Sequence, residues 1–133
     1  MEPMISGGTA AVTRSMLLAR AIGYGVLHLF GADSSHEGDD THIRQSTTVE
    51  KRISVRVNKR DFSCSPWMAQ QAEDFKMLAP ALMQIYGVRI HVHGDGLIPH
   101  IASALGCRTE LLPKFTQVKR EWAWKAKTLW QHI

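Results

Sequence analysis

Four residues near the start of the chain, Ser6, Gly7, Gly8 and Thr9, have the composition of an anion-binding turn. Glycines let the backbone approach a ligand closely, and the hydroxyls and the N–H groups at the start of the following helix can donate hydrogen bonds to a phosphate. The segment is not a P-loop, because no Gly-Lys-Ser/Thr follows, and it is not a GxGxxG motif. A helix cap with a tight turn would use the same residues, so both interpretations stay open.

A second polar group, Gly31, Asp33 and Ser34, follows an apolar stretch. A carboxylate just past a buried strand can accept hydrogen bonds from a ribose hydroxyl or hold a metal-bound phosphate. It can equally accept backbone hydrogen bonds that shape the loop. The acidic and histidine residues of the polar stretch match no zinc or EF-hand spacing, so a solvated loop is favoured over a protein-held metal; they are Asp33, His36, Asp39, Asp40 and His42.

A third group, His93, Gly94, Asp95 and Gly96, forms a tight turn after another apolar stretch. On the preceding strand His91 and His93 share a face, because side chains alternate along a strand. Buried, hydrogen-bonded imidazoles are favoured over catalytic ones for such histidines. Asp95 lies between two glycines at a predicted helix start, and we expect it to cap that helix.

Alternating helices and strands must position these groups. Hydrophobic periodicity predicts helices at 9–22, 65–86 and 97–105, and strands at 26–30, 48–57, 62–64 and 88–92. The strand at 26–30 has the composition of a strand buried on both faces. The strands at 48–57 and 62–64 are predicted to form an antiparallel hairpin through a turn at 58–61.

Local signals refine the two main helices. Ser6 or Thr9 can cap the first helix, and Gly23 ends it. Ser65 followed by proline predicts the start of the long helix, and Pro80 within it predicts a kink or a break near Leu78. Two helix–strand units indicate an α/β fold with a parallel core, in which the glycine-rich corners converge at the carboxyl ends of the strands.

Composition bounds the class of protein. The chain has 133 residues and a formal net charge of +4. Its length is typical of a single domain, which we expect to comprise residues 1–112, followed by an additional segment at 113–133. No apolar run is long enough to span a membrane, and the first residues lack the pattern of a signal peptide, so we expect a cytoplasmic protein without a membrane partner. Cys64 and Cys107 are predicted to be reduced thiols, with Cys64 in the core and not a nucleophile.

The segment 113–133 combines basic residues with tryptophans and is predicted to be a basic helix with an aromatic face. Rings and cations of this kind can bind nucleic acid. Trp122 and Trp130 lie on nearly one stripe of such a helix, which favours docking on the protein or on a second subunit. Nucleic acid is therefore not the expected partner.

Three blocks of the chain, SGGTAAVTRSMLLARAIGYGVLHLFGADSS, FSCSPWMAQQAEDF and IHVHGDGLIPHIA, resemble the 6-hydroxymethylpterin diphosphokinase MptE-like family. The layout of the first block is also similar to bacterial sialyltransferases with a Rossmann-like domain. The resemblance implies a Rossmann-like α/β fold with a short, mainly parallel sheet, an antiparallel hairpin and flanking helices. Family members carry further elements before the Gly-Gly turn, which implies an N-terminally truncated member.

The resemblance also implies a binding site for a nucleotide or nucleotide sugar. Its residues would be Ser6, Gly7, Gly8, Thr9, Gly31, Asp33 and Ser34, with His93, Gly94, Asp95 and Gly96 on the same rim. Diphosphokinase chemistry would bring Mg²⁺ with ATP. At 62–65, where the sialyltransferases carry a basic histidine, this chain has none.

Three functions remain open at this point. The first is binding of a nucleotide or phosphorylated ligand, with transferase activity undecided. The second is a non-enzymatic accessory or phage-borne module that forms a homo-oligomer, because a shortened sheet with an unpaired edge invites pairing with another copy. The third is nucleic-acid binding through the basic segment at 113–133.

Overall fold

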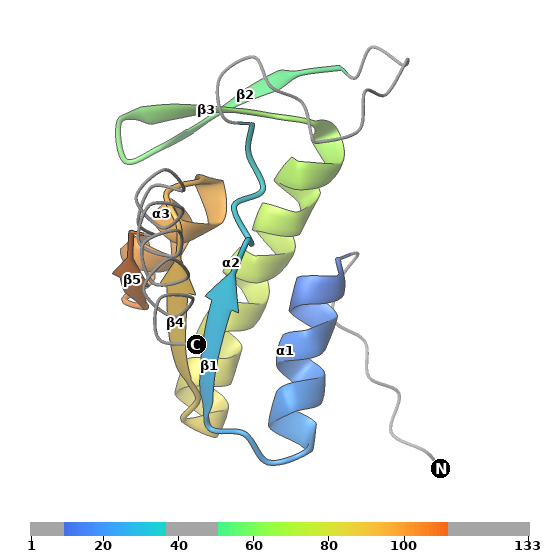
Figure 1. The fold of residues 1–133 in the computed structure, drawn as a ribbon, viewed down its shortest axis with the longest axis vertical. Coiled ribbons are helices and arrows are strands. Elements are labelled where there is room, and N and C mark those ends of the chain that lie inside the picture. Colours follow the sequence, from blue (N-terminus) through green and yellow to red (C-terminus); the bar gives the residue numbers. More distant parts are fainter. Residues whose placement is uncertain (1–9, 37–50, 112–133) are drawn as a thin grey trace, which may run out of the picture.

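A parallel sheet of three strands supports the whole molecule (Figure 1). The structure is a computed structural model that describes residues 10–36 and 51–111. The strands are β1 (Val26–Phe30), β4 (Arg89–His93) and β5 (Arg108–Glu110), in the order β1-β4-β5. Both strand pairs are parallel, and Phe30 of β1 lies beside His93 of β4. The α/β class and the parallel core agree with the prediction.

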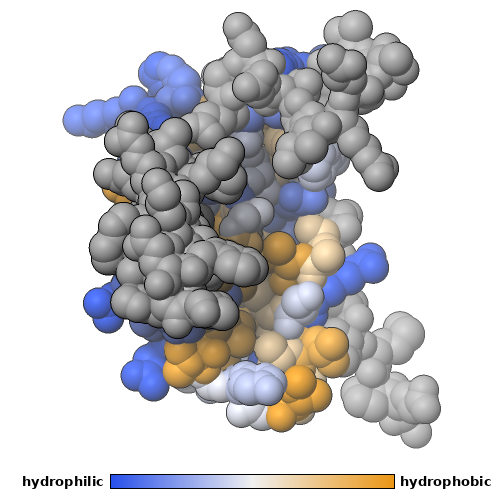
Figure 2. Space-filling model, in the orientation of Figure 1, coloured by the Kyte–Doolittle hydropathy of each residue, from blue (hydrophilic) through white to orange (hydrophobic). Residues whose placement is uncertain are grey.

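Strand β1 is not buried on both faces, which corrects the sequence-based expectation. It lies at the border of the sheet, and only Leu27 among its residues is fully buried. Val26 and Phe30 are 39% and 61% exposed. Figure 2 shows hydrophobic residues gathered on the lower part of the face drawn in Figure 1, near the lower ends of β1 and α1. The central strand of the three is β4, whose Ile90 and Val92 are buried. The apolar composition of β1 therefore does not reflect burial between two layers.

Three helices pack on one face of this sheet: α1 (Ala11–Ala21), α2 (Pro66–Tyr86) and α3 (Leu97–Ala104). One core cluster joins Leu27, Ile90 and Val92 of the sheet to Met16, Phe75, Leu82, Leu97 and Ile98 of the helices. Removing large side chains such as these from water contributes roughly 1.5–3 kcal/mol each. The opposite face of the sheet carries Val26, His28, Phe30, His91 and His93, because side chains alternate along each strand.

Helix α2 begins and ends where the sequence predicts. Ser65 precedes it, and Gly87 adopts a left-handed conformation (φ 65°) directly after it. The Ser65 hydroxyl makes no capping hydrogen bond, however, and it is buried with no partner among the described residues. The helix also continues through Pro80, so of the predicted kink or break the break is absent from it. Tertiary packing of the buried helix face on the sheet outweighs the lost hydrogen bond.

The hairpin consists of β2 (Ile53–Val57) and β3 (Arg60–Cys64). Its turn is shorter than predicted and contains only Asn58 and Lys59, with φ of 48° and 68°. Positive φ at both central residues is the geometry of a two-residue turn that matches strand twist. The hairpin packs beside α3 (Figure 1) and carries Arg60 toward the end of β4.

Several sequence-based predictions concern residues that the structure does not describe. The residues 1–9, 37–50 and 112–133 lie outside it, so the anion-binding turn, the first cap and the basic segment are untested. Both cysteines are free, as predicted, and Cys64 lies in the core, as predicted; Cys107 is buried as well, and burial raises the pKa of each thiol. None of the helices at 10–36 and 51–111 is long and apolar enough to cross a membrane.

Candidate functional site

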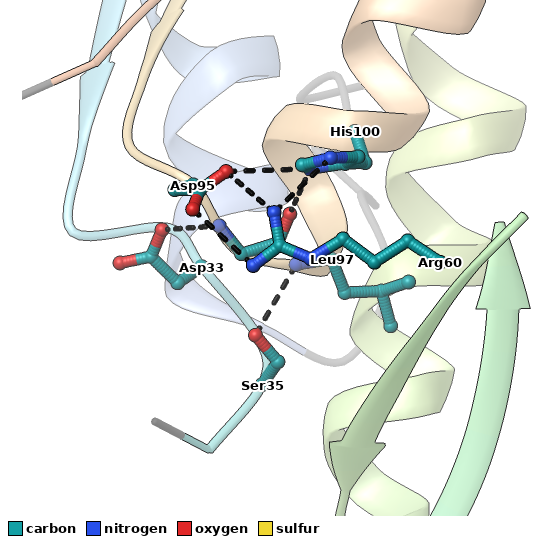
Figure 3. A network of polar contacts seen from close by, with 7 residues as sticks. Asp33, Ser35, Arg60, Asp95, Leu97 and His100 are labelled. Atoms are coloured by element: carbon teal, nitrogen blue, oxygen red, sulfur yellow. Dashed lines mark hydrogen bonds and ion pairs between the residues drawn. The ribbon is translucent and has the colours of Figure 1, made fainter. Parts of the chain in front are cut away.

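The polar corner at the carboxyl ends of β1 and β4 brings two of the predicted groups together. Because Phe30 and His93 are neighbours in the parallel ladder, the chain leaves both strands at the same level. Gly31 (φ 69°) turns the first segment and Gly94 (φ 143°) turns the second. The segment 31–36 then lies against the start of α3 (Figure 3). The predicted convergence is confirmed for Asp33 and the 93–96 turn.

Asp33 and Ser35 cap helix α3 from outside the helix. The Gly96 N–H donates to Oδ1 of Asp33 at 3.1 Å, and the Leu97 N–H donates to Oγ of Ser35 at 3.2 Å (Figure 3). The Ile98 N–H donates to the Asp33 backbone carbonyl at 3.1 Å. These bonds satisfy N–H groups that a helix leaves without intrahelical partners. Of the two roles considered for Asp33, the structure shows the loop-shaping one.

The glycines of the 93–96 turn leave room for Asp33. A Cβ on Gly96 would lie 2.5 Å from the Asp33 Cβ and 2.7 Å from its carbonyl oxygen. A Cβ on Gly94 would collide with the Asp33 carboxylate, and its φ of 143° is itself a conformation that favours glycine. In the described structure, the close contact with Asp33 leaves no room for a side chain at Gly94 or Gly96.

Asp95 does not cap the helix, which corrects the sequence-based expectation. Its carboxylate pairs with the Arg60 guanidinium, Oδ1 at 2.8 Å from Nη1 and Oδ2 at 3.2 Å from Nη2 (Figure 3). The hydrogen bonds and charge of Arg60 hold the pKa of Asp95 below its usual range, and the hydrogen bonds and charge of Asp95 raise the pKa of Arg60. The Arg60 guanidinium also lies over the Phe62 ring, 4.9 Å from its centroid. Both ends of the pair are about half exposed.

A cavity of about 250 Å³ opens on one side of Asp33, between the first turns of α1 and α2. Neither first turn contains an acidic residue, and within the described part of the chain neither helix has a side-chain cap. Trp67 of α2 contributes an indole that is 45% exposed. The lining residues are Ala10, Val12, Thr13, Gly31, Ala32, Asp33, Ser34, Ser35, Trp67, Met68, Gln71 and Ile98.

Ser34 fixes one wall of this cavity. Its hydroxyl donates a hydrogen bond to Oε1 of Gln71 at 2.9 Å, which ties the loop to α2. Ser34 has a positive φ of 50°, a conformation that non-glycine residues seldom adopt. Within α1, the Thr13 hydroxyl donates to the Ala10 carbonyl at 3.0 Å. The cavity is therefore bordered by groups with defined positions.

A second cavity, about 370 Å³, lies on the other side of the 33–35 segment. It is lined by the Arg60–Asp95 ion pair and by His36, Asp61 and Ser63, among others. Opposite charges in direct contact cancel much of the field that either would exert on a ligand. We therefore place the candidate site in the first cavity.

His93 lies on the face of the sheet opposite the helices. Its ring stacks on Phe30 with centroids 4.2 Å apart, and its Nε2 shares a hydrogen bond with Nδ1 of His28 at 3.0 Å. Only 8% of His93 is exposed, so the buried, hydrogen-bonded imidazole predicted for it is confirmed. His91 stacks on His28. Burial is the main cause that lowers the pKa of His91, and the nearby charges of His28 and Arg108 lower it further.

The described residues at this corner offer few ligands for a metal ion held by the protein alone. In the ranges 10–36 and 51–111, no group of three or more His, Cys, Asp or Glu side chains is arranged to hold an ion. Oδ1 of Asp33 and both oxygens of Asp95 already accept hydrogen bonds. Mg²⁺ accompanying a nucleotide stays a prediction.

Sequence reasoning missed several residues at this corner. Ser35, Thr13, Trp67 and Gln71 line the cavity or support the loop, and Arg60 neutralises Asp95. Only Trp67 gave a signal, as an aromatic residue in the first turn of a helix. The Asp33–Gly96 bond joins residues 63 positions apart, which no local pattern reveals.

Comparisons of the chain with protein-family models, with curated proteins and with solved structures found no match. The resemblance to the MptE-like family therefore stays a prediction. The assignment of this corner depends on its own geometry.

Proposed function

We propose that the chain binds a nucleotide or another phosphorylated ligand in the cavity between α1, α2 and the 31–35 segment. The observation that carries this proposal is the position of two helix starts at one cavity, both without an acid or a side-chain cap among the residues 10–36 and 51–111. Backbone N–H groups and the helix dipole favour an anion at such a place.

The other lining groups match the remaining parts of a nucleotide. Asp33 lines the cavity and uses Oδ1 for the helix cap, and we expect the rest of its carboxylate to accept hydrogen bonds from ribose hydroxyls. Trp67 lines the cavity and is 45% exposed, and an indole is a type of ring on which bases stack. A volume of about 250 Å³ suits the sugar and phosphate, with the base toward Trp67.

The Rossmann-like character and the glycine-rich turn at 6–9 belong to this proposal. The chain enters α1 directly after Ser6, Gly7, Gly8 and Thr9, and Ala10 and Val12 line the cavity. A phosphate bound in this cavity would therefore lie beside residues that directly follow that turn in the sequence. Transferase chemistry would require a second substrate and a general base, for which the described part of the chain offers no assigned residue.

A thermal-shift experiment tests the proposal. The full chain is melted with CMP, CTP, ATP or GTP, with and without Mg²⁺, and with the matching nucleosides as controls. A ligand at one hundred times its Kd adds about 2.7 kcal/mol to the free energy of unfolding, which raises Tm by on the order of 10 °C. A shift for nucleotides but not nucleosides would support a phosphate site. Equal responses to both, or no response to any nucleotide, would refute it.

Nucleic-acid binding through 113–133 stays an alternative prediction, since that segment lies outside the described residues. Salt-dependent binding of oligonucleotides that disappears when 113–133 is deleted would support it.

A further inference from the structure

The border of the sheet at β1 has the properties of an association surface. In the described residues β1 pairs with β4 alone, so no strand lies along its other edge. Natural edge strands are usually protected by charged residues, proline or a bulge. The sequence of β1, VLHLF, contains neither proline nor Asp, Glu, Lys or Arg, and its regular register with β4 shows no bulge.

The hydrogen-bonding direction of each β1 residue follows from its pairing with β4. The Arg89 N–H donates to the Gly25 carbonyl at 2.9 Å, and in a parallel ladder alternate residues bond to the same neighbour. Leu27 and Leu29 therefore turn their backbone groups toward β4. Val26, His28 and Phe30 turn theirs toward the border, where they present donors and acceptors in alternation.

We propose that two copies of this chain associate through this border, with β1 of one copy pairing antiparallel to β1 of the other about a two-fold axis at His28. His28 then lies opposite His28 of the second copy, and Val26 lies opposite Phe30 of the second copy. All three outward residues fall in the hydrogen-bonded type of antiparallel pair, in which opposite residues exchange both N–H···O bonds. The two small sheets become one continuous sheet.

Complementarity selects a second copy as the occupant. N–H donors and C=O acceptors alternate along this edge of β1. A two-fold rotation places the donors of one copy opposite the acceptors of the other, so the edge is complementary to itself. The side chains match as well, because Val26 and Phe30 are the exposed apolar residues of the strand and would cover each other. No formally charged residue of β1 would meet a like charge. An interface of this kind is isologous and closes at two copies.

The test introduces charges at the Val26–Phe30 pair in the full-length chain. The double variant V26K/F30K places lysine opposite lysine in the proposed register, whereas V26K/F30E places lysine opposite glutamate. We expect wild type to be a dimer by light scattering and V26K/F30K to bind itself at least about tenfold more weakly. V26K/F30E should regain most of that loss.

Each result decides the proposal. A wild type that is monomeric at every concentration overturns it, and so does a V26K/F30K variant that dimerises as well as wild type. Equal weakening in both double variants overturns the register. If the variants do not fold, amide exchange of wild type at two concentrations decides. The Val26, His28 and Phe30 amides should slow as concentration rises, while those of Leu27 and Leu29 stay constant, and uniform rates would overturn the proposal.

Discussion

Helices α1 and α3 begin at the same edge of the sheet, yet their first turns are treated differently. The start of α3 is occupied by acceptors from the 33–35 segment, two of them side chains. The first turn of α1 has no acid, no described side chain caps it, and it borders a cavity. The difference teaches that one helix start holds the corner together, whereas the other is the place that we propose for an external anion.

The largest effect is expected where the two segments touch. Gly96→Ala would place a Cβ 2.5 Å from the Asp33 Cβ and 2.7 Å from its carbonyl oxygen, and backbone must move to relieve this. We expect a loss of about 3 kcal/mol in the free energy of unfolding, measured with denaturant. Gly25→Ala is the control, because a Cβ there meets nothing within 4 Å. Equal losses in the two variants would contradict the contact.

Removing the cap itself should cost less. Asp33→Ala deletes the acceptor for the Gly96 N–H, and we expect a loss of about 1–2 kcal/mol in denaturant unfolding. Asp33→Asn keeps an oxygen at that position and should retain most of the stability. The pair also sharpens the binding test, because Asp33→Asn changes the charge at the cavity without deleting the cap. A full loss in Asp33→Asn would show that geometry alone does not explain the bond.

Adding an acid to the open helix start separates stability from binding. Ala11→Asp places a carboxylate in the exposed first turn of α1, where the helix dipole favours it, so stability should change by less than about 1 kcal/mol. A nucleotide phosphate would be repelled, and Kd should rise about tenfold, equivalent to about 1.4 kcal/mol. Ala11→Asn is the neutral control for calorimetric titration. Unchanged affinity in Ala11→Asp would place the anion elsewhere.

The smallest effect is expected at Asp95, the acid beside α3 that does not cap it. Arg60 lowers the pKa of Asp95 in the folded chain, so the pair stabilises the fold above the ordinary carboxyl pKa of about 4. That contribution is lost as pH falls through the lower folded pKa. Asp95→Asn should remove this part of the pH dependence and cost less than about 1 kcal/mol at pH 7, because the pair is half exposed. A loss as large as that of Asp33→Ala would contradict the assignment.

Local chemistry in the sequence predicted much of the fold. Pro66 and Gly87 mark the ends of α2 because proline suits a first helical turn and glycine tolerates a left-handed residue. The apolar runs predicted β1 and β4 because each forms part of the core. Strand β5 was missed, since Arg108, Thr109 and Glu110 are all exposed and show no apolar alternation.

The corner itself was predicted only in outline. Asp33 and the 93–96 turn were identified, but their roles depend on contacts between distant segments. Asp95 lies next to α3 in sequence, yet Arg60 of the hairpin binds it, and Asp33 takes the capping role. Burial of β1 was overestimated because strand order, which places it at the border, is a property of the whole topology.

The external capping of α3 has a consequence for how the chain folds. The helix depends on acceptors that lie 62 and 63 positions earlier, at Ser35 and Asp33. During synthesis those two residues leave the ribosome well before the helix that needs them. A peptide or permuted chain in which the segment with Asp33 and Ser35 can no longer reach α3 should therefore show fraying of the first turn around Leu97. This fraying is expected even where the hairpin and α2 still form.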